Sequence, residues 1–222
     1  MINLEDMVVV FDLDDTLYPE EDYVISGIRY LEEFLTAIYE NSIKEEILSA
    51  YLGGRKDFLE YTCKKLKLSK SSKESLLWAY RLHKPNIKLS NEIEDVLKFL
   101  KEMRSKVIIL TDGRSITQRL KVHSLGLNKL PLYISEDYSS EKPNKKRFIQ
   151  IQNDYPKKFY VYIADNPLKD FKAPLEMNWT CIGANWVKNK IHNFELSSMP
   201  KITLNCPLQI KEVLLKMDGI ED

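Results

Sequence analysis

The chain has 222 residues, of which 44% are hydrophobic and 30% charged, a composition typical of a globular protein and not of a disordered chain. Lys plus Arg and Asp plus Glu each total 33, so the chain as a whole does not attract nucleic acid or a membrane surface. The three cysteines show no zinc-ligand spacing, and no apolar run is long enough for a signal peptide or a membrane helix. We expect a cytoplasmic protein that binds neither nucleic acid nor a membrane, and the oligomeric state stays open.

The first predicted element is a buried strand, Met7–Asp12, whose apolar run is typical of strands covered on both sheet faces. The strand leads into three carboxylates within four residues, Asp12, Asp14 and Asp15. These groups repel one another, and a bound cation would remove that cost; carboxylate oxygens suit Mg²⁺ and also Mn²⁺. One carboxylate could then serve as a nucleophile while its neighbour transfers protons. The alternative is an acidic turn in which Asp15 or Thr16 caps a following helix.

Residues 20–87 contain no convincing strand and instead place apolar residues at helical spacing. The pattern predicts a small all-helical domain inserted after the first strand, so that the α/β core would consist of residues 1–19 and 88–222. The aromatic side chains of the insert are expected to lie in its core and not to form a ligand cage. They include Tyr30, Phe34, Tyr39 and Trp78.

After the insert, strands alternate with helical patterns, which predicts a doubly wound parallel α/β sheet. The strand candidates are Lys106–Asp112, Leu132–Ser135, Phe159–Asp165, Thr180–Ala184 and Lys201–Asn205. Like the strand at Met7–Asp12, two of them end at an aspartate. Because open α/β sheets bind ligands outside the carboxyl ends of their strands, we expect these acids to lie along one functional rim.

Four short motifs resemble those of the haloacid dehalogenase superfamily and occur in that superfamily's order. They are FDLDDTLY at Phe11–Tyr18, ILTDG at Ile109–Gly113, EKPN at Glu141–Asn144 and IADNPLKD at Ile163–Asp170. The longer stretches KFYVYIADNPLKDFKAPLEMNW and YRLHKPNIKL are similar to hydrolases of this superfamily associated with surface-polysaccharide biosynthesis. The resemblance implies a Rossmann-like core, with the helical insert as a cap that closes over the site and selects the substrate.

The resemblance also implies roles for the motif residues. Asp12 would attack phosphorus and become an aspartyl-phosphate, and Asp14 would protonate the leaving oxygen and then deprotonate the hydrolytic water. Asp170 would orient Lys142 or a metal-bound water. Thr16 would help to position the residues that contact the substrate and would not contact it itself. The expected Mg²⁺ ligands are Asp12, Asp165 and the backbone carbonyl of Asp14. The expected phosphate contacts, through side chains or backbone N–H groups, are Leu13, Thr111, Asp112, Gly113 and Lys142.

The charge of a phosphoryl group supports this assignment, because such a group cannot approach bare carboxylates without a metal ion and a lysine. One departure is Asp112, which stands where asparagine is frequent in the superfamily. An extra carboxylate near a phosphate is unfavourable unless it points away.

Asp14 favours phosphoryl transfer over dehalogenation, because the dehalogenases of the superfamily lack an acid at this place. We predict a Mg²⁺-dependent phosphomonoesterase, with Mn²⁺ as a possible substitute, that hydrolyses a small phosphorylated metabolite. A sugar phosphate is the first choice and a nucleotide the second. The alternatives are a phosphomutase that uses the same aspartates and a non-catalytic partner protein. Candidate specificity residues are Arg55, Arg81 and His83, each with a structural role as the competing interpretation.

Overall fold

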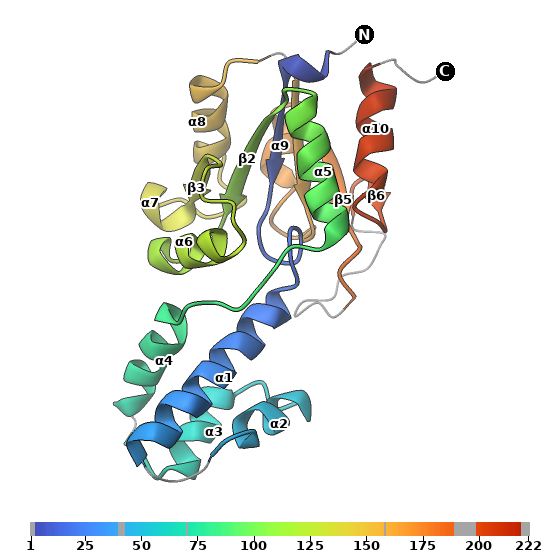
Figure 1. Ribbon diagram of the computed structural model, residues 1–222. Coiled ribbons are helices and arrows are strands. Elements are labelled where there is room, and N and C mark those ends of the chain that lie inside the picture. The colour runs from blue at the N-terminus through green and yellow to red at the C-terminus, as the bar shows by residue number, and fades with distance from the viewer. Residues whose placement is uncertain (1–2, 40–42, 70, 158, 189–198, 219–222) are drawn as a thin grey trace. The chain divides into compact units, whose positions relative to one another are not determined.

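The computed structural model describes residues 3–39, 43–69, 71–157, 159–188 and 199–218 (Figure 1). It divides into two compact units. The first, the α/β core, comprises Met1–Glu20 and Lys88–Asp222, and the second, the helical unit, comprises Glu21–Ile87. Each unit has its own hydrophobic core. None of the described helices combines the length and the apolar composition needed to cross a membrane.

The α/β core is built on a six-stranded parallel sheet with the strand order β3-β2-β1-β4-β5-β6. The predicted strands are confirmed, each to within one residue at either end. Their bounds are β1 Met7–Phe11, β2 Lys106–Thr111, β3 Leu132–Ile134, β4 Phe159–Ala164, β5 Thr180–Ala184 and β6 Ile202–Leu204. Every residue of β1 is buried, as expected for a central strand covered on both faces.

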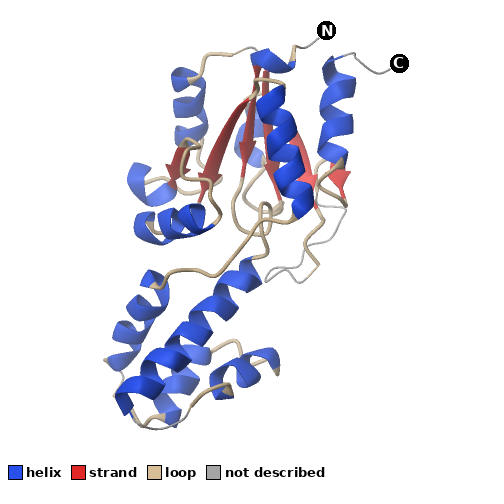
Figure 2. Cartoon of the chain, viewed as in Figure 1, coloured by secondary structure: helices blue, strands red, loops and turns tan. Residues whose placement is uncertain are grey.

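Helices cover both faces of this sheet, which confirms the doubly wound architecture (Figure 2). Figure 1 shows α5 and α10 on the face opposite to α9. On the α9 face, Phe148 of α8 and Phe171 pack with Tyr162 and Trp179 over the sheet. The described helices of the core are η1 Leu4–Asp6, α5 Asn91–Glu102, α6 Ser115–Ser124, α7 Ser135–Tyr138, α8 Lys146–Asp154, α9 Lys172–Glu176 and α10 Gln209–Asp218.

The helical unit contains the helices α1 Glu20–Tyr39, α2 Glu46–Leu52, α3 Phe58–Lys65 and α4 Ser72–Leu82. Helix α1 begins at Glu20, the last residue of the first core segment. Its buried cluster is aliphatic on α1, where Ile28, Leu31 and Leu35 lie at helical spacing. The carboxylate of Glu32 is buried and accepts hydrogen bonds from two N–H groups at the start of α2 (2.8 and 2.9 Å). This contact fixes α2 against α1.

The prediction that the aromatic residues of the insert form its core was wrong for four of them. Their side chains are 38 to 41% exposed, and they are Tyr30, Phe34, Tyr39 and Trp78. For the three on α1, the physical reason is that this helix carries apolar residues on more than one face, and Ile28, Leu31 and Leu35 occupy the buried face. Two of the excluded rings, Tyr30 and Phe34, stack on each other instead, with centroids 6.0 Å apart.

Candidate active site

The predicted acids meet at the carboxyl ends of β1 and β4, which are neighbours in the sheet. Asp12 directly follows β1, and Asp165 directly follows β4. Together with Asp170, each offers a carboxylate oxygen within 4.8 Å of the others, and all three residues are buried. Buried carboxylates this close repel one another unless a cation lies among them, and their oxygens are hard donors. The donor set therefore fits a divalent cation such as Mg²⁺ or Mn²⁺.

A buried lysine joins two of these acids. The Nζ atom of Lys142 lies 2.9 Å from Asp12 Oδ1 and 2.6 Å from Asp170 Oδ1, and the lysine side chain is fully buried. The hydroxyl of Tyr162 accepts from Lys142 and donates to Asp170, both at 3.2 Å. Burial alone would lower the pKa of Lys142, but Asp12 and Asp170 raise that pKa well above its ordinary value. Lys142 is therefore a fixed cation beside Asp12.

The raised pKa of Asp12 indicates that Lys142 alone does not offset the negative charge of the site. Burial is the largest influence on its carboxyl and raises its pKa to about 6, with Lys142 acting in the opposite direction and Asp170 adding to the rise. A cation among the three carboxylates would favour the ionised form that a nucleophile requires. The electrostatics thus agree with the donor geometry.

The segment after β1 turns Asp14 away from the cluster that contains Asp12. Asp15 adopts a left-handed conformation with φ of 53°, and a backbone bridge then joins Asp14 to Tyr18. The Asp15 carboxylate accepts from the N–H of Glu20 at the start of α1 (2.9 Å). The predicted helix-capping role of an acid therefore holds for Asp15, while Asp12 and Asp14 have other partners.

Asp14 faces the end of β2 and helix α6. Its carboxylate accepts from Lys121 Nζ (2.8 and 3.0 Å), from the Tyr18 hydroxyl (2.5 Å) and from Gln118 Nε2 (3.1 Å). The same Gln118 nitrogen lies 2.7 Å from Thr111 Oγ1. Burial would raise the pKa of Asp14, but Lys121 and the other donors outweigh burial and lower it. One amide nitrogen thus contacts both the Asp14 carboxylate and the Thr111 hydroxyl.

Comparison with known proteins identifies the family. A family model described as haloacid dehalogenase-like hydrolase matches residues 9–184, a range that includes the three clustered acids, Asp14 and Lys142. The chain belongs to the haloacid dehalogenase-like hydrolases. It is accordingly a hydrolytic enzyme with the Rossmann-like fold of that family. No curated protein matches the chain.

Solved structures share the fold of this hydrolase. A 2-haloacid dehalogenase from Pseudomonas syringae pv. Tomato DC3000 matches with a TM-score of 0.64 and 18% identity, over 98% of this chain and 100% of that one. YfnB from Bacillus subtilis, solved bound to magnesium, matches with a TM-score of 0.64 and 18% identity, over 94% of this chain and 98% of that one. A HAD phosphatase from Thermococcus onnurineus matches with a TM-score of 0.60 and 21% identity, over 94% of this chain and 97% of that one. At these identities the likeness concerns the fold alone.

Asp112 of the hydrolase, the departure noted in the sequence, has its own cation. Its carboxylate forms an ion pair with Arg147, which is fully buried, and accepts from the backbone N–H of Lys142 (3.2 and 3.3 Å to its two oxygens). Arg147 also donates to the Thr111 carbonyl (2.8 Å). The extra negative charge is therefore neutralised, and the pair ties the end of β2 to the segment that carries Lys142.

Replacing Arg147 with methionine is expected to destabilise the hydrolase by about 3–5 kcal/mol, because it leaves the largely buried Asp112 carboxylate with the partly exposed Lys169, 3.9 Å away, in place of a buried cation. Urea unfolding followed by circular dichroism measures this change in the free energy of unfolding. Arg104→Met is the control, since Arg104 is exposed and 3.9 Å from Glu5, and it should change stability by less than about 1 kcal/mol. Equal effects of the two substitutions would contradict the role given to the buried pair.

The other predicted core residues lie at the same rim. Leu13 is fully buried between the two acids, and Thr16 is fully buried with its carbonyl accepting from Trp186 Nε1 (2.9 Å). Gly113 has a φ of 140°, and its N–H donates to Ser135 Oγ (2.9 Å). A phosphate bound by this N–H would have to share it with, or take it from, the serine hydroxyl. The phosphate contacts of these residues remain predictions.

His83, one candidate for substrate contact, is packed inside the helical unit. It is 2% exposed, its Nδ1 lies 2.5 Å from the Tyr80 carbonyl oxygen, and its Nε2 lies 3.1 Å from Ser26 Oγ. A Cβ on neighbouring Gly27 would come within 2.3 Å of the Tyr80 ring, so the glycine permits this close packing. These contacts favour the structural role that was the competing interpretation for His83.

The two candidate arginines have local partners within the helical unit. Arg55 lies 3.6 Å from Asp57, and its guanidinium is 5.1 Å from the Tyr61 ring centroid. Arg81 lies over Trp78 at 5.5 Å. Both contacts are those of partly exposed side chains, which leave a charged group accessible. Contact with substrate stays a prediction for both.

Five of the described side chains of the site were not anticipated from the sequence: Tyr18, Gln118, Lys121, Arg147 and Tyr162. Gln118 and Lys121 stand three residues apart on α6, so they share one face of the helix that follows the ILTDG motif. That position after a motif strand is the one signal in the sequence that could have indicated them. Arg147 shows no such signal, because a basic residue at the start of a polar helix is usually exposed.

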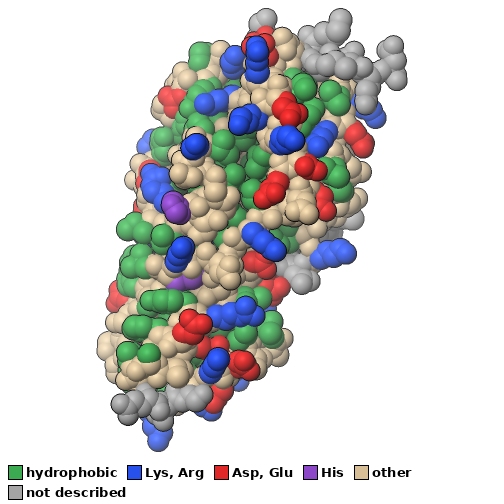
Figure 3. Space-filling view, in the orientation of Figure 1, with side chains coloured by type: hydrophobic (Ala, Val, Ile, Leu, Met, Phe, Trp, Pro, Cys, Tyr) green, Lys and Arg blue, Asp and Glu red, His purple; other side chains and the backbone are tan. Residues whose placement is uncertain are grey.

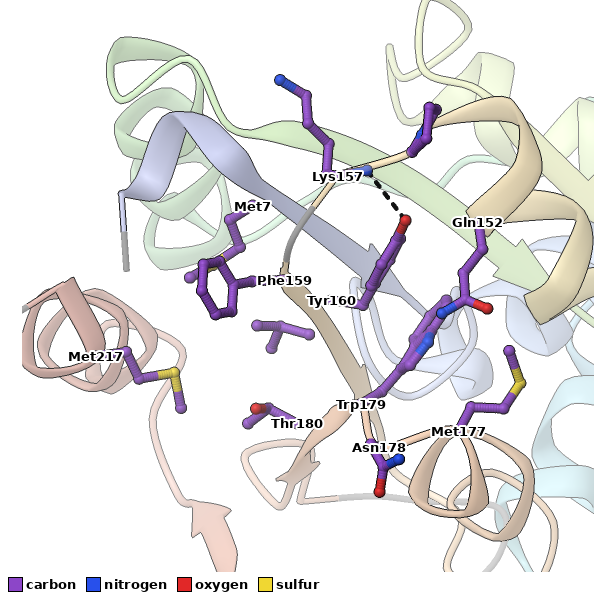
Figure 4. A pocket seen from close by; sticks show the side chains of 12 residues that line it. Met7, Gln152, Lys157, Phe159, Tyr160, Met177, Asn178, Trp179, Thr180 and Met217 are labelled. Atoms are coloured by element: carbon purple, nitrogen blue, oxygen red, sulfur yellow. Dashed lines mark hydrogen bonds between the residues drawn. The ribbon is translucent and has the colours of Figure 1, made fainter. Parts of the chain in front are cut away.

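A pocket at the other end of the strands is not the reaction site. It has a volume of about 550 Å³ and is lined at the start of β4 and β5 by Phe159, Tyr160, Trp179 and Thr180, with Met217 of α10 opposite (Figure 4). Ligands of open α/β sheets bind at the carboxyl ends of the strands, where the acids and lysines lie.

On the face shown in Figure 3, acidic and basic side chains are interspersed, in line with the balanced composition.

Proposed function

We propose that this hydrolase is a Mg²⁺-dependent phosphomonoesterase that acts on a small phosphorylated metabolite through an aspartyl-phosphate on Asp12. The observation that carries the proposal is the buried cluster of Asp12, Asp165 and Asp170 with the Lys142 ammonium 2.9 Å from Asp12. Phosphoryl transfer needs little covalent help from a protein but strong neutralisation of the transferred charge. A nucleophile beside a fixed cation and a set of hard metal ligands provides both.

In the first step of the proposed reaction, a carboxylate oxygen of Asp12 forms a bond to phosphorus as the bond to the leaving oxygen breaks. For the alcohol to depart neutral, Asp14 must enter this step protonated and give its proton to that oxygen. In the second step, Asp14 takes a proton from water, whose oxygen bonds to phosphorus and releases inorganic phosphate from Asp12. Thr111 donates its hydroxyl hydrogen to the phosphoryl group, and Lys142 offsets the charge.

The metal would be held by the carboxylates of Asp12 and Asp165 and by the backbone carbonyl of Asp14, with Asp170 adjoining. When bound, Mg²⁺ supplies charge neutralisation of the phosphoryl oxygens. The fit rests on the close carboxylate oxygens and on the raised pKa of Asp12, both of which a cation would relieve. Mn²⁺ has the same preference for oxygen ligands.

The proposed substrates are sugar phosphates first, on the resemblance to hydrolases of polysaccharide biosynthesis, and nucleotides second. We propose the helical unit as the cap that selects among them. Its residues are inserted directly after the segment that carries Asp12 and Asp14. The turn at Gly54, where φ is 100°, presents Arg55, whose guanidinium suits a second anionic group of the substrate.

Metal removal tests the proposal. Inorganic phosphate release from a panel of sugar phosphates and nucleotides should require Mg²⁺, fall to background with EDTA and return when Mg²⁺ is added in excess. Release that persists after EDTA would contradict the metal requirement. Isomerised sugar phosphate with little free phosphate would favour the phosphomutase, and no turnover of any substrate would favour the non-catalytic alternative.

A further inference from the structure

Helix α6 holds the carboxylate of Asp14 from one side. Lys121 Nζ lies 2.8 Å from Asp14 Oδ1 and 3.0 Å from Oδ2, so it contacts both oxygens, and Gln118 Nε2 lies 3.1 Å from Oδ2. The Lys121 side chain is 5% exposed, whereas that of Arg119 on the same helix is 53% exposed and pairs with Asp137. A lysine buried to this degree requires an anionic partner, and Asp14 provides one at ion-pair distance.

Gln118 also connects Asp14 to the strand that carries Thr111. Gln118 Nε2 lies within hydrogen-bond distance of Thr111 Oγ1 (2.7 Å), of the Asp112 carbonyl oxygen (2.9 Å) and of Asp14 Oδ2. One amide therefore spans the hydroxyl proposed to bind phosphate and the carboxylate proposed to transfer protons. Apart from Lys121 and Gln118, the Asp14 carboxylate accepts from the Tyr18 hydroxyl of its own loop.

We propose that Lys121, supported by Gln118, is a positioning residue that fixes the Asp14 carboxylate where it can take a proton from the attacking water. This inference rests on the proposed phosphomonoesterase function and assigns no substrate contact to Lys121. General acid–base groups work only within hydrogen-bond reach of the proton they move, so the orientation of Asp14 decides its contribution. Lys121 sets that orientation because it binds both carboxylate oxygens.

The two half-reactions separate this role from a merely structural one. 4-Nitrophenolate is a good leaving group and departs without a proton, so formation of the aspartyl-phosphate from 4-nitrophenyl phosphate does not need Asp14. Hydrolysis of the aspartyl-phosphate does need it, because water must lose a proton as it attacks. A misplaced Asp14 should therefore slow the second half-reaction and spare the first.

The experiment is stopped-flow release of 4-nitrophenolate in the presence of Mg²⁺. Lys121→Met should keep a nitrophenolate burst, while its steady-state rate falls by roughly 10²-fold, the lower range for loss of acid–base catalysis. Acid quench during the steady state should show phosphate accumulated on the protein. With an alkyl phosphate, whose leaving oxygen needs a proton, the same variant should accumulate no phosphate on the protein.

Two further variants keep the test decisive. Lys121→Arg keeps a cation with several donors and should recover most of the steady-state rate, and Arg119→Met, on the exposed side of the same helix, should behave as wild type. A Lys121→Met protein whose burst falls in proportion to its steady-state rate, or a Lys121→Arg protein no better than Lys121→Met, would overturn the positioning role. Wild-type protein with neither burst nor turnover would instead overturn the proposed function.

Discussion

Replacing Asp12 with asparagine is expected to abolish phosphate release, with a loss on the order of 10⁴-fold or more, as for other enzymes that lose their nucleophile. The amide oxygen of asparagine carries no negative charge and cannot form the proposed acyl phosphate. Asparagine has nearly the same size as aspartate, and Lys142 keeps its 2.6 Å contact with Asp170, so the variant should fold. The measurement is inorganic phosphate release with Mg²⁺, together with circular dichroism and a thermal melt.

Incubation with a slowly hydrolysed phosphate ester sharpens this experiment. Wild-type protein should carry acid-stable, hydroxylamine-labile phosphate, whereas Asp12→Asn should carry none. Asp154→Asn is a matched control for the charge change, because Asp154 ends α8 on the core surface and accepts from Gln150 (2.8 Å) and from the Tyr133 hydroxyl. Wild-type rates in a folded Asp12→Asn protein would show that the nucleophile is another group.

Replacing Lys142 with alanine should lower kcat by roughly 10²–10³-fold, the effect typical of losing one group that stabilises charge in the transition state. The same substitution removes the cation between Asp12 and Asp170 and leaves two buried carboxylates facing each other. Breaking a buried pair in this way costs about 3–5 kcal/mol of stability. Urea unfolding and turnover of 4-nitrophenyl phosphate should therefore both change.

Mg²⁺ provides an internal check on the Lys142→Ala result. A ligand that binds the folded state alone stabilises it, so Mg²⁺ should raise the unfolding midpoint of this variant. Lys145→Ala is the matched control, since Lys145 lies in the same segment, is exposed and pairs with Glu176 at 2.7 Å. A Lys142→Ala protein as active and as stable as Lys145→Ala would remove Lys142 from the site.

The fold was largely predictable from the sequence because the core strands are short, continuous apolar runs. Met7–Phe11 and Phe159–Ala164 have no alternative with a helical period, and each is followed by an aspartate that marks the carboxyl end. The buried face of the helical unit was harder to predict. Its helix α1 has apolar residues around much of its circumference, so the sequence pattern could not distinguish Leu31, which is buried, from Phe34, which is 39% exposed.

The acids of the site were predictable, but their partners were not. Asp12 and Asp165 follow strands, and strand ends in a parallel sheet lie at one edge. Lys121 and Arg147 are polar residues on helices, a pattern that normally indicates a solvated face. Their burial depends on which strand end each helix faces. Asp14 and Asp112 offset the cost of burying these two charges by forming ion pairs with them. Such pairings arise from tertiary structure and leave no periodic trace in the sequence.

The central position of β1 also bears on how the chain folds as it is synthesised. Val9 lies between Val107 of β2 and Val161 of β4, so both neighbours of β1 come from chain that follows the helical unit. Remote pairings form late, because a long loop must close before they stabilise anything. At a synthesis rate of about 5–20 residues per second, this fully apolar strand waits for seconds without neighbours. The first strand, and not the inserted helices, is where aggregation during synthesis is expected to begin.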